Sequence, residues 1–509
     1  MTAEQRIHPA MKYYFLTGAT GLLGSYLLRD NLRAGRRLAV LCRANRNESA
    51  RQRVESAMAR WEHETGEILP RPVVFEGNLH RPNLGLGSAA LRWIARHCDS
   101  MVHNAASLTF EGSDPQGEPW LTNLQGTRHV LDVCRLTGIR KFHHVSTAYV
   151  CGLREGRVLE NELDVGQPLG NDYEKSKVQA ETMVHAADFL DQRTVYRPSI
   201  IVGDSQTGYT ATFHGFYATL KLAHTLVSKV VLGATGGQPL MGALGLGGNE
   251  CKNFVPVDWV SAVMTHILAQ PQHHGKTYHL TTPAPMPIAQ MTAVVQAAVE
   301  TFSTLADEAD QWRCDGSWFA ETFRQQMDIY RAYWRDDPQF DVANTLAAAP
   351  QLPCPDIDGD MLMNMAKYAI QCNFGKPRPR PLKPDFDVQH HLQPLLCAHE
   401  AAGAQGADAP CLGLQVNGPG GGQWKLLLAD RRLAAAEHGI NGHCTAVFHL
   451  SSKTFHRLAT QQFTVAQAVQ AGRVQIEGNG LARHELESIL QATVGSESPR
   501  GVRSPAQLA

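Results

Sequence analysis

The chain has 509 residues, of which 43% are hydrophobic and 19% charged, and its formal net charge is −1. This length predicts two or three domains, and the balanced charge argues against a nucleic-acid-binding surface or a strongly basic membrane-binding patch. No stretch reaches the roughly 18 apolar residues that a membrane-spanning helix needs. The first ten residues also lack the apolar core of a signal peptide.

The 11 cysteines are scattered, odd in number and contain no C-x-x-C pair. In a chain of this length they indicate reduced thiols and a cytoplasmic protein. Adjacent histidines occur at 143–144, 273–274 and 390–391. Because neighbouring residues of a strand point to opposite faces, we expect no metal site there.

The first element is a short apolar strand at residues 12–17, followed by the glycine turn TGATGLLG (17–24) and a helix that ends at Gly35. Glycines in such a turn let a pyrophosphate approach the backbone at the helix N-terminus. The pattern therefore favours a dinucleotide-binding turn over a tight turn without ligand.

Further strands are expected along the first half of the chain, and helical patterns such as 121–138 separate most of them. The expected strands are 37–43, 72–77, 100–106, 141–147 and 193–203. Strands that alternate with helices predict an α/β fold, a Rossmann-type doubly wound parallel sheet.

The end of the second strand favours one cofactor. A carboxylate there would hold the ribose hydroxyls of the adenosine, but this chain has Arg43 followed by Arg46. A guanidinium suits a 2′-phosphate through charge-assisted, forked hydrogen bonds. We predict NADP(H), with Arg43 as the main contact and Arg46 as a helper; the alternative is a solvated arginine at a strand end.

The segment 172–181, DYEKSKVQAE, places Tyr173 four residues before Lys177, on one face of a helix. A free tyrosine has a pKa near 10, and a neighbouring ammonium favours the phenolate and so lowers that pKa. The pair therefore predicts a proton donor and its activator. The alternative is an ordinary solvated helix.

Two later segments mark changes in organisation. At about 205–250, an apolar helix leads into a glycine-rich stretch, which indicates either a surface loop or a lid lined with small and apolar groups. Residues 373–387 are rich in proline and predict a semi-rigid linker. The tail 496–509 is expected to be disordered.

The motifs together resemble a known superfamily. TGATGLLG, Asn104-Ala-Ala106, Asn123 in NLQGT, VSTAYVCG, Tyr173-x-x-x-Lys177 and RPSIIVG occur in the order and spacing of extended short-chain dehydrogenases/reductases. The resemblance covers roughly residues 12–370. Within the superfamily the chain is most similar to the fatty acyl-CoA reductase and thioester reductase branch, on HVSTAYVCG, RPSIIVGDSQTG, NFVPVDWV and YWRDDPQFD.

The resemblance implies a catalytic set of Thr147, Tyr173 and Lys177, in which Lys177 also holds the nicotinamide ribose. Ser146 is the alternative hydroxyl, but along a strand it faces the other way. Asn78 stands where the family usually has an aspartate, and its amide oxygen can still accept a hydrogen bond from adenine. The implied NADP(H)-binding residues are Thr17, Gly18, Thr20, Gly21, Leu22, Leu23, Gly24, Arg43, Arg46, Asn78, Leu79, Asn104, Ala105, Ala106, Asn123, Tyr173, Lys177, Pro198, Ser199 and Ile200.

Residues 388–495 resemble a sterol carrier protein type 2 domain, on GRVQIEGNG (472–480) and NGPGGGQWKLLLADRR (417–432). That resemblance implies a small α+β domain with an apolar tunnel for a lipid or acyl chain; a stabilising or dimerising module is the alternative. We therefore expect a reductase domain at 1–372, with a substrate subdomain at about 205–250 and 280–372, then the linker and the lipid-carrier-like domain.

The resemblances imply an NADPH-dependent reductase of a hydrophobic acyl thioester, carried on CoA or a carrier protein, that yields an aldehyde and, by a second hydride, an alcohol. One alternative is a ketone reductase or alcohol dehydrogenase that acts on a β-keto acyl or sterol-like lipid. Another is a lipid-binding carrier with a vestigial reductase fold. Because the superfamily often dimerises, a homodimer is also expected.

Overall fold

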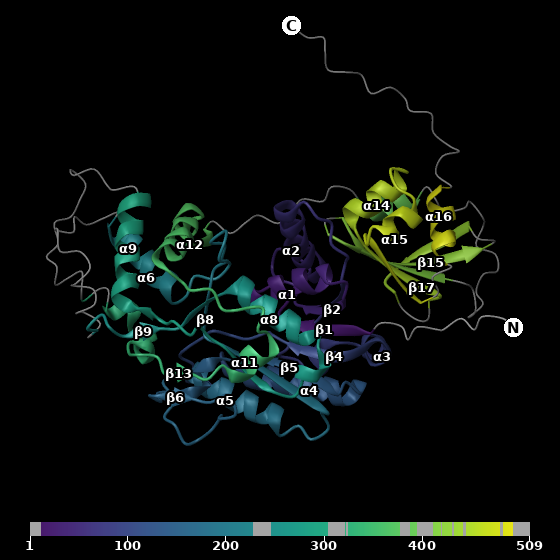
Figure 1. Cartoon of the computed structure of the whole chain (residues 1–509). Coiled ribbons are helices and arrows are strands. Elements are labelled where there is room, and N and C mark those ends of the chain that lie inside the picture. Colours follow the sequence, from purple (N-terminus) through teal and green to yellow (C-terminus); the bar gives the residue numbers. More distant parts are fainter. Residues whose placement is uncertain are drawn as a thin grey trace, which may run out of the picture. The chain divides into compact units, whose positions relative to one another are not determined.

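The computed structural model describes residues 12–227, 246–303, 321, 324–376, 387–393, 411–418, 420–429, 432–440, 444–478 and 482–491 (Figure 1). The chain forms two compact units, one of residues 1–43 and 74–380 and one of residues 44–73 and 381–509. Most of the expected glycine-rich loop and of the linker, and the whole of the tail, lie outside the described residues.

The first unit is built on a seven-stranded sheet in the order β3-β2-β1-β4-β5-β7-β11. Its strands are β1 (Tyr13–Thr17), β2 (Arg37–Cys42), β3 (Val73–Glu76), β4 (Cys98–His103), β5 (Lys141–Val145), β7 (Gln192–Pro198) and β11 (Thr277–Leu280). The pairs β1–β2, β1–β4, β4–β5, β5–β7 and β7–β11 are all parallel. The predicted Rossmann-type fold is confirmed, and the strand order reverses between β1 and β4, where such sheets bind ligands.

Helices cover both faces of this sheet. They are α1 (Leu22–Arg33), α3 (Ser88–His97), α4 (Gly126–Thr137), α5 (Asp172–His185) and α8 (Val257–Leu268). In Figure 1, α4 and α5 lie on one side of the sheet, and α1 and α8 on the other. Helix α1 buries Leu27 and Leu28 completely, which anchors the helix that follows the glycine turn.

A smaller helical part completes the first unit, with α6 (Phe216–Val227), α9 (Ile288–Phe302), α11 (Ala343–Ala348) and α12 (Gly359–Gln371). Its short strands are β6 (Arg157–Val158), β8 (Ile200–Val202), β9 (Cys251–Lys252), β10 (Phe254–Pro256), β12 (Met286–Pro287) and β13 (Gln339–Phe340). Helices α6, α9 and α12 share one apolar core, which includes Leu220, Val295 and Leu362.

Two expected elements are interrupted. The strand expected at 193–203 breaks at Ser199, because β7 stays in the main sheet whereas β8 pairs with β10. The helix expected at 121–138 begins with a π-helical turn, Leu121–Gln125, and continues as α4. In that turn the Asn123 amide bonds to the backbone of Ser107 and to the hydroxyl of Ser176, which fixes it against α5.

The second unit contains a mixed five-stranded sheet in the order β16-β15-β14-β17-β18. The strands are β14 (Cys411–Asn417), β15 (Gly422–Ala429), β16 (Arg432–His438), β17 (Ala446–Ser451) and β18 (Val474–Gly478). Its helices are α2 (Ala50–Thr65), α13 (Val388–Leu392), α14 (Ser452–Ala459), α15 (Val465–Gln470) and α16 (Arg483–Gln491). Strand residues such as Leu414 and Phe448 pack with Phe455 and Leu486 of the helices, which confirms an α+β C-terminal domain.

Helix α2 belongs to this second unit, although in sequence it lies between β2 and β3 of the reductase sheet. Arg71 and Glu55 form a buried ion pair of 2.8 Å in the same segment. A Cβ on Gly418, at the end of β14, would lie 2.9 Å from Glu55 Cγ. The absence of a side chain at Gly418 therefore allows this close approach. None of the helices in the described part of the chain is long and apolar enough to span a membrane.

Candidate active site

The turn between β1 and α1 requires glycine at two positions. Gly18 has φ of +74°, and a Cβ there would lie 2.8 Å from Ala105 Cα. A Cβ on Gly24 would lie 1.9 Å from the carbonyl oxygen of Gly18. The first N–H groups of a helix lack partners within the helix, and the first turn of α1 contains no acidic residue. The turn therefore suits the pyrophosphate of a dinucleotide.

Side chains at the ends of β1 and β4 hold this turn in place. Thr17 Oγ1 accepts hydrogen bonds from the backbone N–H groups of Asn104 and Ala105, each 3.2 Å long. Asn104 Nδ2 donates to the carbonyl oxygen of Gly18 at 3.3 Å. His103 Nδ1 lies 2.8 Å from Thr17 Oγ1, and burial lowers the pKa of His103 to about 3. The structure thus brings together four predicted cofactor-binding residues, Thr17, Gly18, Asn104 and Ala105, supported by a neutral histidine.

The predicted catalytic residues also come together. Asn171 caps α5 by accepting a hydrogen bond from the Glu174 N–H. Tyr173 and Lys177 are only 8% and 3% exposed, so DYEKSKVQAE is not a solvated surface helix. Thr147 follows β5 in extended conformation and shares a hydrogen bond with Tyr173.

Burial dominates the protonation of this site. It raises the pKa of Tyr173 to about 12, although the hydrogen bond with Thr147 acts in the opposite direction. It lowers the pKa of Lys177 to about 8, against the attraction of Glu181. The Lys177 ammonium donates to the Val145 carbonyl oxygen at 2.8 Å. The expected lowering of the tyrosine pKa by Lys177 is therefore not seen: burial raises this pKa, and the hydrogen bond that opposes the rise comes from Thr147.

The residues expected at the adenosine end lie at the ends of β2 and β3. Arg43 is exposed, and its charge contributes to the lowered pKa of His80, after burial. The Asn78 side-chain oxygen accepts a hydrogen bond of 3.0 Å from the His80 N–H, which leaves one lone pair for a ligand. Arg46 is part of the second unit, so its role beside Arg43 stays a prediction.

The remaining predicted residues lie around these groups. Ser199 is 6% exposed, and its hydroxyl has no hydrogen-bond partner among the described residues. The Pro198 carbonyl oxygen lies 3.5 Å from Thr147 Oγ1. An unpartnered buried hydroxyl is a group that a bound ligand can satisfy. Of the others, Leu22 and Leu23 are buried in α1, Thr20, Leu79 and Ile200 are half-buried, and Ala106 is exposed.

The sequence patterns missed an ion pair beside Lys177, at α5. Glu181 and Arg197 are 0% and 1% exposed, and Arg197 Nε lies 3.1 Å from Glu181 Oε1. This arginine holds the pKa of Glu181 well below its usual range despite burial. The spacing of Glu181, four residues after Lys177, was the available signal, because it places Glu181 on the same buried helix face.

Aromatic rings that the patterns did not identify surround Tyr173. The Phe110 ring lies 5.8 Å from the Tyr173 ring, 5.3 Å from Tyr330 and 5.5 Å from Tyr333. Phe110, Ala218, Leu222, Met327 and Tyr330 form one apolar cluster together with Tyr333 and Trp334, hereafter the Phe110 cluster. The cluster gives Tyr173 an apolar neighbourhood.

One carboxylate connects three of the motifs on which the family resemblance rests. Asp337 accepts hydrogen bonds from the Tyr149 hydroxyl, the Lys252 ammonium and the Asn253 N–H, each 2.8 Å long. Tyr149 belongs to VSTAYVCG, Asn253 to NFVPVDWV and Asp337 to YWRDDPQFD. This network joins the three motifs, which are far apart in the sequence, at one point of the fold.

Residues 16–264 match the NAD-binding family described as male sterility protein, and residues 394–491 match the SCP-2 sterol transfer family. The chain thus contains one segment similar to the male sterility family and a later segment similar to the SCP-2 sterol transfer family. The expected resemblance to thioester reductases and sterol carriers is confirmed. With the Rossmann-type fold and the glycine turn, it makes the protein an NAD(P)-dependent oxidoreductase that uses a nicotinamide cofactor.

Curated relatives support this assignment. The aldehyde reductase lnaA of Aspergillus flavus is 26% identical over 407 residues, which cover 72% of this chain and 36% of the relative. The nonribosomal peptide synthetase asaC of the same fungus is 26% identical over 54% of this chain and 27% of its own length. The chain thus spans about a third or less of these relatives, and their whole activities do not transfer to it directly.

Solved structures share the fold of the first unit. The terminal R domain from the myxalamid PKS-NRPS biosynthetic pathway is 24% identical with a TM-score of 0.57, over 74% of this chain and 94% of that chain. The reductase domain of a nonribosomal peptide synthetase from Mycobacterium tuberculosis is 21% identical with a TM-score of 0.52, over 72% of this chain and 93% of that chain.

Proposed function

We propose that this protein is an NADPH-dependent reductase of a hydrophobic acyl thioester, carried on CoA or on a carrier protein, that releases an aldehyde and, after a second reduction, an alcohol. The observation that carries the proposal is the buried set of Thr147, Tyr173 and Lys177, whose lysine acts on His103, the residue that contacts Thr17 at the start of the glycine turn. This set has both a proton donor and a cation at the place where a nicotinamide ring would lie.

The reduced nicotinamide supplies a hydride to the thioester carbon when it is bound. The hydroxyls of Thr147 and Tyr173 donate hydrogen bonds to the oxyanion that develops on the substrate oxygen. With a pKa of about 12, Tyr173 is protonated at neutral pH and gives its proton to that oxygen. Lys177, with a pKa of about 8, is still charged at neutral pH, holds the ribose and stabilises the phenolate. The hemithioacetal then breaks its C–S bond to give a thiol and an aldehyde.

The preference for NADPH rests on Arg43. This exposed guanidinium at the end of β2 is the group that a 2′-phosphate would contact. The cradle of Gly18 and Gly24 and the unpartnered hydroxyl of Ser199 fit a dinucleotide, whether or not it carries that phosphate.

The hydrophobic acyl substrate is supported by the Phe110 cluster, which packs aromatic and aliphatic side chains next to Tyr173. The relatives named aldehyde reductase and nonribosomal peptide synthetase support release of an aldehyde and delivery by a carrier protein. The SCP-2 domain supports a lipid partner. A cytoplasmic location and a homodimer stay predictions of the same proposal.

The test incubates the purified full-length protein with NADPH and a series of acyl-CoA thioesters, and follows NADPH loss and free thiol together. Thiol in step with NADPH loss supports thioester reduction, and two NADPH per thiol support an alcohol product. NADPH loss without thiol, on β-keto thioesters alone, replaces the proposal with a ketone reductase. NADPH binding without turnover on any carbonyl supports a lipid carrier with a vestigial reductase fold.

Two variants connect this reaction to the site. Tyr173→Phe removes the proton donor and should abolish thiol release. Tyr368→Phe, in α12, removes a hydroxyl elsewhere in the same unit and should leave the rate unchanged. Equal rates for the two variants would contradict the assigned role of Tyr173.

A further inference from the structure

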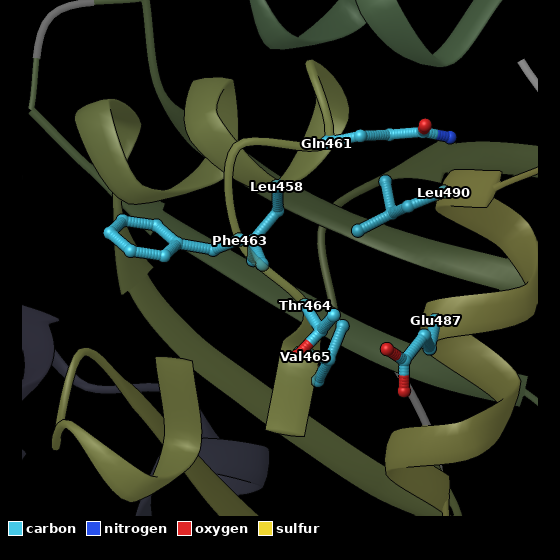
Figure 2. Close-up of a pocket in the computed structure, with 7 residues that line it drawn as sticks. All are labelled: Leu458, Gln461, Phe463, Thr464, Val465, Glu487 and Leu490. Atoms are coloured by element: carbon cyan, nitrogen blue, oxygen red, sulfur yellow. The ribbon is translucent and has the colours of Figure 1, made fainter. Parts of the chain in front are cut away.

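The C-terminal unit has a pocket of about 420 Å³ between α14, the loop after it and α16. Seven residues line it: Leu458, Gln461, Phe463, Thr464, Val465, Glu487 and Leu490 (Figure 2). Four of them are apolar and three are polar. An apolar pocket with a few polar groups is typical of a small-molecule site in which the polar groups select the ligand.

Among the described residues that line the pocket, only Glu487 carries a charge. Figure 2 shows its side chain reaching from α16 toward Thr464 and Val465, into the space between the helices. A carboxylate accepts hydrogen bonds and, when ionised, donates none. It also repels a second anion at short range in a partly apolar site. Glu487 therefore favours a neutral head group with an O–H donor and disfavours a fatty acid anion or the phosphates of CoA.

Gln461 is a second unusual feature of the pocket. It has φ of +58°, in the left-handed region, just after the end of α14. The Gln462 N–H donates to the Arg457 carbonyl oxygen at 2.8 Å, which closes a helix end of the type that usually has glycine at this position. A glutamine here strains the backbone but places an amide at the edge of the pocket. The side chain is thus a candidate for ligand contact rather than for stability.

Two guanidinium groups lie near Phe463, at the part of the pocket lining that is away from Glu487. Arg457 and Arg473 lie over the Phe463 ring, at 5.5 and 4.5 Å from its centroid. Figure 2 shows that ring directed away from Glu487. These cations would favour an anionic ligand if its head group lay on their side of Phe463, so a comparison of a neutral ligand with an anionic one decides the matter.

We propose that this pocket binds a neutral lipid that carries a hydroxyl group, with Glu487 accepting the hydrogen bond of that hydroxyl and Gln461 contacting the lipid at another edge of the pocket. A long-chain alcohol has this chemistry, and it is also the four-electron product of the reaction proposed above. The idea that the reductase supplies this alcohol rests on the proposed function. The idea that the pocket binds such an alcohol does not. The C-terminal domain then holds the product of reduction rather than the thioester substrate.

The experiment titrates the full-length protein with a pyrene-labelled long-chain alkanol and with the alkanoate of the same length and label, and follows pyrene fluorescence. We expect the alkanol to bind about tenfold more tightly, and Glu487→Gln to remove most of that preference. Glu485→Gln, on the same helix but outside the lining, should retain it. Tighter binding of the alkanoate, or an unchanged preference in Glu487→Gln, would overturn the proposal.

Gln461→Gly separates a binding role from a structural one. Because glycine relieves the left-handed strain, this variant should be at least as stable as the wild type while binding the alkanol several-fold more weakly. Unchanged affinity would contradict the role of Gln461. Tyr173→Phe, which blocks turnover, should bind the alkanol like the wild type, so a failed reductase assay and a failed binding assay are distinguishable.

Discussion

Glu181 and Arg197 form a buried ion pair that joins helix α5 to strand β7, one helical turn beyond Lys177. Arg197 also donates to the carbonyl oxygens of Glu160 and Glu162, so its guanidinium is satisfied by several acceptors. The pair connects the helix that carries Tyr173 and Lys177 to the strand that leads into Pro198 and Ser199. It thereby holds the proposed catalytic residues and the predicted nicotinamide-binding stretch in a fixed relative position.

Replacing Arg197 by methionine should destabilise the protein by about 3–5 kcal/mol, because the Glu181 carboxylate is left buried without its partner. Urea unfolding measures the loss. The exposed pair Arg135–Asp188 offers a matched control, since both side chains are largely in solvent, and Arg135→Met should change stability by about 1 kcal/mol or less. If both variants unfold at the same urea concentration, the buried pair does not stabilise the fold.

The pH dependence of stability should reveal the buried Lys177. Its pKa is lowered to about 8 in the folded protein, against 10.5 for an exposed lysine. Between these values the unfolded chain binds more protons than the folded one, so stability should rise with pH from about 8. Tyr173 acts in the opposite direction above pH 10, because its folded pKa of about 12 keeps a proton that the unfolded chain loses.

The measurement is the free energy of unfolding of the wild type and of Lys177→Met between pH 7 and 10. The wild type should gain up to about 3 kcal/mol relative to the variant over this range, because a proton that only the unfolded chain binds changes the free energy by about 1.36 kcal/mol per pH unit. Other titrating groups contribute equally to both proteins and cancel in the difference. Parallel curves would show that Lys177 is not desolvated as the structure describes.

The sequence patterns identify the proposed catalytic set because each residue belongs to a local motif with its own chemistry, and the catalytic role of the set stays a prediction. The backbone packs tightly at Gly18 and Gly24, so the glycine turn is visible in the sequence. The four-residue spacing of Tyr173 and Lys177 places both side chains on one face of α5. The patterns did not predict the direction in which the pKa of Tyr173 shifts. The direction in which the pKa of Tyr173 moves depends on how completely the ring is desolvated, which no local spacing records.

Contacts between residues far apart in the sequence account for the packing that the sequence patterns did not predict. The sequence patterns did not predict α2 or its packing in the second unit, where Gly418 leaves room for Glu55. Deleting residues 388–509 would therefore remove the packing of α2 as well as the lipid-carrier-like domain. Point substitutions in the pocket are the cleaner test of what that domain contributes.

Arg43 should control the choice between NADPH and NADH. Arg43→Gln removes the guanidinium at the end of β2 and should raise the KM for NADPH about ten- to a hundredfold, the range expected for charge-assisted hydrogen bonds, with little effect on NADH. Arg92→Gln, at an exposed position of α3, is the control and should change neither KM. An equal effect of Arg43→Gln on both cofactors would indicate a general loss of structure instead of lost phosphate recognition.

The Phe110 cluster should set the preference for acyl chain length. Phe110 contacts the Tyr173 ring directly, whereas Tyr330 reaches that ring through Phe110. Tyr330→Ala removes apolar surface from the cluster but leaves the hydroxyls of Thr147 and Tyr173 in place. It should therefore raise KM for long-chain thioesters more than for acetyl-CoA, and change kcat little, because lost uniform binding appears in KM. Phe189→Ala, whose ring lies against Arg135 instead, is the matched control. A fall in kcat on every chain length would mean that the cluster positions Tyr173 and does not bind the acyl chain.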